Sequence, residues 1–119
     1  MGLDSFFMKK LDEPDKDGNM FSIDENFPDL PLAVGIFSGG PGGFRGKCYN
    51  DIIQQITGES LYQHIISPEK VKEMSDKLEA STSLGELMES NGWVEEDITA
   101  LQKAFKYASD NGLTLLGWW

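Results

Sequence analysis

Residues 38–47 have the sequence Ser38-Gly39-Gly40-Pro41-Gly42-Gly43-Phe44-Arg45-Gly46-Lys47, a glycine-rich loop that carries two cations. An apolar run over residues 32–37 precedes this loop and predicts a buried strand, and a helical pattern begins near Lys47. Glycines let backbone N–H groups approach a ligand closely, and the N-terminus of a helix carries a partial positive charge. The order of strand, glycine loop and helix therefore predicts a site for an anion.

The spacing of the glycines matches neither G-x-x-x-x-G-K-[ST] nor G-x-G-x-x-G. Cys48 stands where the first of these motifs needs a hydroxyl residue to hold magnesium. The alternative interpretation is that the glycines serve backbone geometry and that the two cations balance nearby acids. Under the ligand-binding hypothesis, Phe44, Tyr49 or a terminal tryptophan stacks on a base, and the candidate residues are Ser38, Gly39, Gly40, Gly42, Gly43, Phe44, Arg45, Lys47 and Tyr49.

The rest of the chain alternates strand and helix signals. Two β-prone runs, residues 3–11 and 20–23, flank a polar turn and predict a hairpin. Apolar residues at helical spacing predict helices at four places: from Lys47 to a stop at Gly58, from Pro68, after a capping box of Ser83 and Glu86, and from residue 94 to Asn111-Gly112.

The last seven residues, 113–119, are too apolar for a free tail and predict a strand beside the N-terminal hairpin. We therefore expect a single acidic α+β domain over residues 1–119. Its sheet is small and mostly antiparallel, is formed from both chain ends plus a middle strand near residue 34, and is covered by three to four helices.

The formal net charge of −10 is unevenly distributed. Residues 1–31 and 59–119 are acidic, with net charges of −5 and −6, whereas residues 32–58 carry +1. A strongly negative protein repels phosphate backbones, so we expect no nucleic-acid partner, and it attracts basic proteins. Solubility alone is the other interpretation of this acidity.

Cys48 is the single cysteine, so an intrachain disulfide is excluded, and a reducing, cytoplasmic location is expected. No apolar run has the length of a membrane span, and we expect no membrane partner. Asp15, Asp17 and Asn19 alternate like the first ligands of a calcium loop, but Met20 and Asn26 occupy the positions of the required glycine and glutamate. We expect no metal and no cofactor.

Catalytic residue types are sparse in this chain. Cys48 lies beside Lys47 near a predicted helix N-terminus, a setting that favours a reactive thiol, and His64 is the lone histidine. A Cys48–His64 pair requires the fold to bring the two together, and otherwise His64 is a partly buried structural residue. No pair of carboxylates is marked out among twenty acids. We therefore expect a protein that is not an enzyme, with a reactive Cys48 as a further hypothesis.

Trp118 and Trp119 end the chain. Two interpretations remain open for them. Terminal tryptophans on a returning strand pack in the core, or they form a sticky edge that dimerises or receives a partner, because aromatic residues are enriched at interfaces. In the second case the protein forms a homo-oligomer or docks a protein partner.

The opening Met1-Gly2-Leu3-Asp4, followed by an aromatic residue and the basic pair Lys9-Lys10, resembles the start of small uncharacterised proteins of phages and bacteria. The resemblance implies a compact accessory protein concerned with conflict between host and phage or between bacteria. Size, charge and the sparse catalytic inventory together favour a non-enzymatic binding protein of the inhibitor, immunity or counter-defence type that engages a protein partner. The alternative is a binder of a phosphorylated or nucleotide ligand through loop 38–47.

Overall fold

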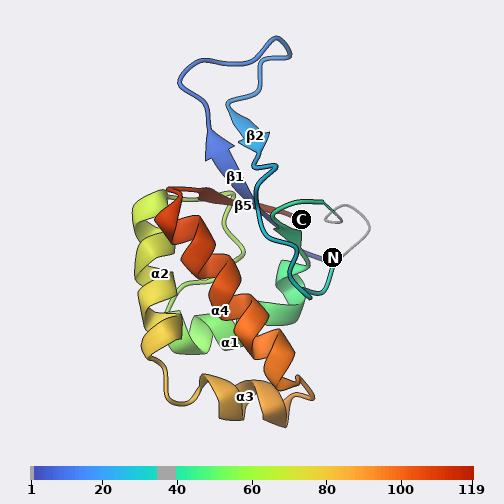
Figure 1. The fold of residues 1–119 in the computed structure, drawn as a ribbon, viewed down its shortest axis with the longest axis vertical. Coiled ribbons are helices and arrows are strands. Elements are labelled where there is room, and N and C mark those ends of the chain that lie inside the picture. The colour runs from blue at the N-terminus through green and yellow to red at the C-terminus, as the bar shows by residue number, and fades with distance from the viewer. Residues whose placement is uncertain (1, 35–39) are drawn as a thin grey trace.

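The computed structural model of the chain describes residues 2–34 and 40–119. These residues form an α+β fold with five strands and four helices, which confirms the predicted class (Figure 1). The strands are β1 (Asp4–Lys10), β2 (Phe21–Ile23), β3 (Gly43–Phe44), β4 (Ile65–Ile66) and β5 (Thr114–Trp118). The helices are α1 (Gly46–Thr57), α2 (Pro68–Ala80), α3 (Leu84–Ser90) and α4 (Glu95–Asp110).

The sheet is antiparallel and has the strand order β2-β1-β5-β4, with β3 also paired to β1. The predicted hairpin of β1 and β2 is present, and β5 returns beside β1 as expected, with Phe7 opposite Leu115. The helices lie on one side of the sheet, whereas the hairpin extends past them (Figure 1). This extension lengthens the molecule, which measures 46 × 28 × 24 Å.

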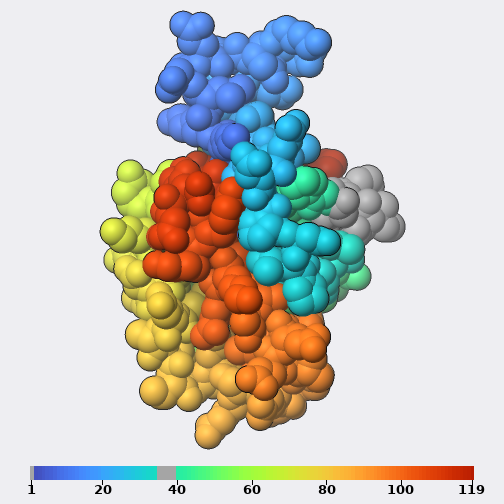
Figure 2. Space-filling model, in the orientation of Figure 1, coloured from blue at the N-terminus to red at the C-terminus, as the bar shows by residue number. Residues whose placement is uncertain are grey.

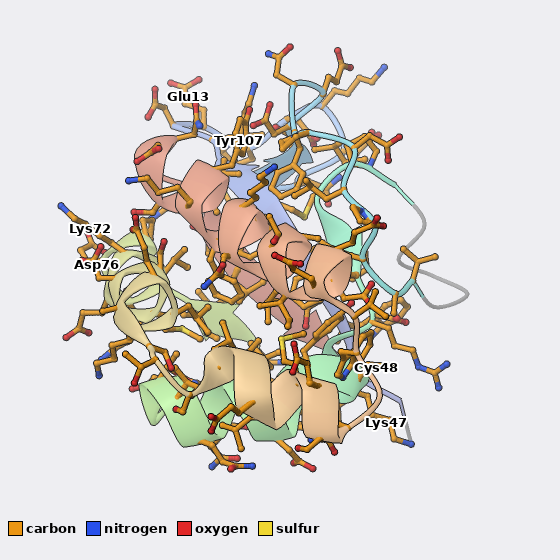
Figure 3. The ribbon with its side chains drawn as sticks, turned by 60° about the horizontal axis from the view of Figure 1, so that its bottom comes forward. Glu13, Lys47, Cys48, Lys72, Asp76 and Tyr107 are labelled. Atoms are coloured by element: carbon orange, nitrogen blue, oxygen red, sulfur yellow. The ribbon has the colours of Figure 1, made fainter. Side chains whose placement is uncertain are left out.

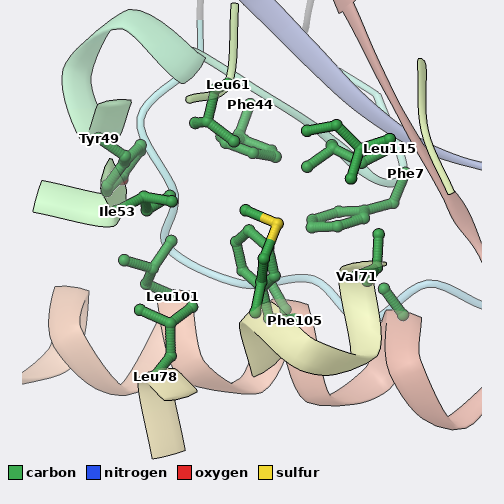
Figure 4. Close-up of a cluster of buried hydrophobic side chains, with 14 of the residues drawn as sticks. Phe7, Phe44, Tyr49, Ile53, Leu61, Val71, Leu78, Leu101, Phe105 and Leu115 are labelled. Carbon is green, nitrogen blue, oxygen red and sulfur yellow. The ribbon is translucent and has the colours of Figure 1, made fainter. Parts of the chain in front are cut away.

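The core lies between the sheet and the helices and is centred on Phe7 (Figure 4). The ring of Phe7 stacks on Phe27 and Phe44 at centroid distances of 5.6 and 5.4 Å, and it meets Phe105 of α4 edge to face at 5.1 Å. Pairs of this kind stabilise by about 0.5–1.5 kcal/mol beyond the burial of their area. Phe7 thereby joins β1, β3, α4 and the connector after β2.

Helix boundaries follow local signals in most places. Gly58 adopts the left-handed conformation with φ of 78° and ends α1, as predicted, and Pro68 begins α2 behind the capping hydroxyl of Ser67. The capping box predicted for Ser83 and Glu86 is wrong. The Ser83 side chain makes no capping bond, and Ser81 Oγ accepts from the N–H of Leu84 at 3.1 Å instead, because the chain turns two residues earlier.

The middle strand was misplaced by the sequence pattern. Residues 32–34 form no strand, and residues 35–37 of the predicted strand lie outside the described residues. The middle strand that pairs with β1 is β3, inside the glycine loop, with Phe44 opposite Ser5. Residues 32–34 instead run beside this loop, where the N–H of Arg45 donates to the carbonyl of Ala33 at 2.7 Å.

A buried carboxylate ties the end of the hairpin to α4. Asp24 is 2% exposed and accepts from the Tyr107 hydroxyl at 2.7 Å and from the Asn26 N–H at 3.0 Å, while the Lys9 ammonium lies 3.6 Å away. Burial by itself would raise the pKa of Asp24, but these hydrogen bonds and the ammonium outweigh it, so the pKa of Asp24 is lowered.

We predict that Tyr107→Phe lowers stability at neutral pH, because it removes a hydrogen bond to an ionised, buried carboxylate. A lowered native pKa contributes stability above the unfolded value of about 4, and this contribution is lost as the pH falls through the native pKa. The difference in urea midpoint between wild type and Tyr107→Phe should therefore be largest at pH 7 and shrink in acid. Tyr62→Phe, at a 38% exposed tyrosine, is the control. A pH-independent difference would contradict the prediction.

Candidate functional site

At two positions of the loop, 42 and 46, the backbone geometry requires glycine. Gly42 has φ of 78°, and a Cβ built on it would lie 2.5 Å from the carbonyl oxygen of Phe7. Gly46 opens α1 so close to β1 that a Cβ would overlap Ser5 Oγ and lie 3.0 Å from Leu3 Cδ2. Only residues without side chains allow the loop to approach β1 so closely. The geometry of these two positions agrees with the structural interpretation of the glycines.

Backbone N–H groups of the described part of the loop donate to the protein itself. Gly43 N–H donates to Gly40 O at 3.0 Å, Lys47 N–H donates to Leu3 O at 3.2 Å, and Cys48 N–H donates to Arg45 O at 3.1 Å. An anion cradle needs such donors directed at the ligand. In the folded loop, these N–H groups already donate to carbonyl oxygens of the protein and are not directed at a ligand. Of the predicted site residues, Ser38 and Gly39 lie outside the described residues.

Two predicted ligand contacts are corrected by burial. Phe44 is 1% exposed and Tyr49 is fully buried, so neither ring can stack on an external base. The Tyr49 hydroxyl accepts from the Ala33 N–H at 2.9 Å, and its ring stacks on Trp93 at 4.9 Å. Burial raises the pKa of Tyr49. The pattern gave no warning, because aromatic residues beside a glycine loop serve a core and a ligand equally well.

The charged residues of the loop are accessible. Arg45 and Lys47 are exposed, and Lys47 and Cys48 lie together at the surface near the start of α1 (Figure 3). Cys48 is a free, exposed thiol. The hypothetical partner His64 is exposed rather than partly buried, and its ring stacks on Trp119 with a centroid distance of 4.6 Å. The described contacts of His64 thus place it with the C-terminus.

The terminal tryptophans do not lie in the core. Trp118 is 60% exposed and Trp119 is 40% exposed. Trp119 packs between His64 and Tyr62, the second contact being edge to face at 5.5 Å. The core interpretation is therefore wrong for both residues, because β5 presents its last residues beyond the edge of the helical layer. Their role in binding a partner stays a prediction.

The strongest charge feature is an end of the helical layer that sequence analysis did not single out. Between Lys77 and Lys103 the chain has six acids and no lysine or arginine. These residues span the last turn of α2, all of α3 and the start of α4, opposite the hairpin (Figure 1). We call the exposed members the acidic end: Glu79, Glu86, Glu89, Glu95 and Glu96.

The carboxylates of the acidic end are not neutralised within the described residues. Among the described residues, four of the twenty acids form ion pairs, namely Asp24, Glu59, Glu73 and Asp110. None of these four belongs to the acidic end. Asp97, the sixth acid of the stretch, has a local role, since its carboxylate accepts from the Val94 N–H at 3.1 Å and caps α4. Counting charges over shorter windows would have revealed this stretch from the sequence.

A shallow hollow of about 360 Å³ adjoins the acidic end. Leu30, Pro31 and Ala100 provide its apolar lining, and Glu95 and Glu96 border it. A second hollow, of about 410 Å³, lies on the other side of the same connector, between residues 27–34 and the turn at 40–43. The space-filling view shows the connector lying on the surface below the hairpin and beside α4 (Figure 2).

The described residues contain neither a cluster of side chains suited to a metal ion nor a helix suited to span a membrane. No group of three or more His, Cys, Asp and Glu side chains among them is arranged to hold a metal ion. Asp15 of the acidic turn accepts from the N–H groups of Asp17 and Asn19, both at 2.9 Å, and so orders the loop between β1 and β2. No helix in the described part of the chain combines the length and apolarity needed to cross a membrane.

In comparisons with known proteins, no family model, curated protein or solved structure matched the chain. The assignment of function therefore rests on the chemistry of the chain's own residues.

A pair of alanine variants tests the structural interpretation of the loop glycines. Gly42→Ala should lower the free energy of unfolding by about 2 kcal/mol or more, since a left-handed alanine alone costs about 1–2 kcal/mol and its Cβ meets backbone at Phe7. Gly40→Ala has open space around its Cβ and should change stability by less than about 0.5 kcal/mol. Urea unfolding measures both. Equal, small effects would mean that Gly42 is not held as described.

Proposed function

We propose that this protein is a non-enzymatic binding protein that engages a basic protein partner through the acidic end. The observation that carries the proposal is the stretch between Lys77 and Lys103, whose exposed carboxylates have no cationic partner among the described residues. Like charges gathered on one surface raise the local potential and repel one another, which costs stability. A partner that carries cations relieves this repulsion on binding.

The hollow beside Glu95 and Glu96 supports a specific form of recognition. Lysine and arginine side chains have an aliphatic stem and a charged end. A stem lying on Leu30 and Pro31 would bury apolar surface, and its charge would reach the two carboxylates. Lys103, on the same rim, would repel a second cation and attract an acid of the partner. Charge complementarity of this kind accelerates association and selects partners more than it raises affinity.

An acidic binding surface is also what an inhibitor, immunity or counter-defence protein would use against a basic target. A small protein that blocks a nucleic-acid-binding or otherwise basic protein needs a rigid, acidic surface and no catalytic group. Helices α2 and α4 pack directly on each other through Leu78 and Leu101 in the core, which holds the acidic end on a fixed support (Figure 4). We also propose a cytoplasmic location, which is inferred from the single cysteine of the chain.

The proposal is tested by capture of partners from a lysate of the encoding organism with two variants of equal charge. Glu86→Gln/Glu89→Gln/Glu95→Gln/Glu96→Gln changes the acidic end, and Asp12→Asn/Glu13→Gln/Asp17→Asn/Glu25→Gln changes the hairpin region. Each quadruple variant raises the net charge from −10 by four, to −6. We expect the wild type and the hairpin variant to capture the same basic protein at low salt, and the acidic-end variant to lose it.

Raised salt should weaken the capture, because exposed charges are screened over about 10 Å at 0.1 M ionic strength. A partner that both variants lose equally responds to net charge alone and contradicts a specific site. A partner that neither variant nor salt affects would overturn the proposal.

The small-molecule alternative has its own measurement. Because the N–H groups of Gly43, Arg45 and Lys47 already have acceptors, we expect no change in melting temperature with inorganic phosphate or with nucleotides. A ligand at a hundredfold excess over its Kd would add about 2.7 kcal/mol of stability. A shift that disappears in Arg45→Ala/Lys47→Ala would instead support binding of an anionic ligand at loop 38–47.

A further inference from the structure

The face of the sheet that points away from the helices is unusually apolar. In an antiparallel sheet covered on one side, the residues that point to solvent are normally polar. Here the alternation along β1 places Phe7 in the core and Phe6 and Met8 on the opposite face. The strand registers add residues from three further strands to that face. We call it the outer face, and its apolar members are Phe6, Met8, Phe21, Ile23, Ile65, Leu116 and Trp118.

Exposure shows that much of this face is accessible in the described part of the chain, although Thr114, opposite Met8, is buried. Ile23, Ile65 and Trp118 are 53%, 58% and 60% exposed, and Phe6, Met8 and Leu116 are partly exposed. Large exposed apolar patches on soluble proteins mark sites that another molecule covers. The face also includes β4 at an edge of the sheet, where an isoleucine projects into solvent.

Charge indicates which molecule covers the outer face. By the alternation of β1, the ionised residues of this face are Asp4 and Lys10, and their charges cancel. A basic partner gains nothing there and is drawn to the acidic end instead. Two copies of a protein with a net charge of −10 repel each other least where the surface is neutral. The outer face is such a surface, and it is separated from the acidic end by the core.

We propose that the outer face binds the outer face of a second copy, with the two β1 strands antiparallel across the interface. Asp4 and Lys10 lie at opposite ends of β1, about 20 Å apart at 3.3 Å per residue. Consider a two-fold axis that lies midway between the two sheets, runs perpendicular to β1 and passes over the middle of that strand. This axis brings Asp4 of one copy to Lys10 of the other, twice. The same axis places Phe6 over Met8 of the second copy.

This geometry is that of two aligned sheets packed about 10 Å apart. It is isologous, as symmetric dimers require. A parallel arrangement of the two β1 strands would bring Asp4 to Asp4 and Lys10 to Lys10, so the charges select the antiparallel one. Neither Asp4 nor Lys10 forms an ion pair among the described residues, and both are available for this contact.

The first measurement is the molar mass of the purified full chain in solution by light scattering after gel filtration. We expect twice 13.2 kDa at micromolar concentration. Ile23→Lys/Ile65→Lys should give the monomer, because it places charges within the interface at two exposed positions. The control Val94→Lys changes a valine that is 59% exposed but lies beside α4, and it should leave the dimer intact. Circular dichroism confirms that each variant is folded.

Charge exchange then tests the orientation. Asp4→Lys and Lys10→Asp should each weaken dimerisation, and Asp4→Lys/Lys10→Asp should restore it, since the pair meets with reversed signs. A monomeric wild type would overturn the proposal, as would a dimer insensitive to the isoleucine variant. Single exchanges without effect, or a double exchange that does not recover, would overturn the antiparallel stacking. The proposed partner site on the acidic end is tested separately, because apart from the control Val94→Lys none of these variants changes it.

Discussion

The packing of Phe7 is the interaction on which the rest of the fold depends. Its ring contacts Phe27, Phe44 and Phe105 within one cluster, so a single side chain of β1 fixes the connector, the glycine loop and α4 together. The carbonyl of the same residue limits position 42 to glycine, and its N–H donates to Gly42 O at 2.8 Å. Side chain and backbone of Phe7 thus define how closely the loop approaches the sheet. Because α1 follows the loop directly, this contact helps to position the start of α1.

Local signals in the sequence were sufficient where structure depends on neighbours along the chain. Gly58, Pro68 and the alternation of β1 act within a few residues, and the elements they predict are present. The role of the glycine loop depends instead on contacts between distant residues. Gly42 and Gly46 are needed because β1 lies against the loop, and this cause is not visible in a window of neighbouring residues. The cap of α3 is local, but the capping-box pattern assigned it to Ser83 and the structure gives it to Ser81.

The candidate site was predicted less well than the fold, for a related reason. Phe44 and Tyr49 were candidates by residue type, but type does not distinguish a ring that stacks on a ligand from one that fills the core. Burial decides between them, and burial is a property of the whole fold. The acidic stretch between Lys77 and Lys103 can be found from the sequence alone. Its placement on three consecutive helices, which only the structure gives, shows that its charges lie at one end of the helical layer.

Charge and apolar surface are separated in this molecule, and the separation constrains how both are used. The acidic end belongs to the helical layer, whereas the outer face of the sheet is apolar and carries one acid and one base, Asp4 and Lys10. If the acids surrounded the apolar face, repulsion between copies would oppose any self-association through it. With the acidic end on the far side of the core, a dimer formed through the sheet directs two acidic ends outward, away from each other. Such a dimer would present two sites to a basic partner, and simultaneous engagement of both would strengthen binding without any additional contact at either site.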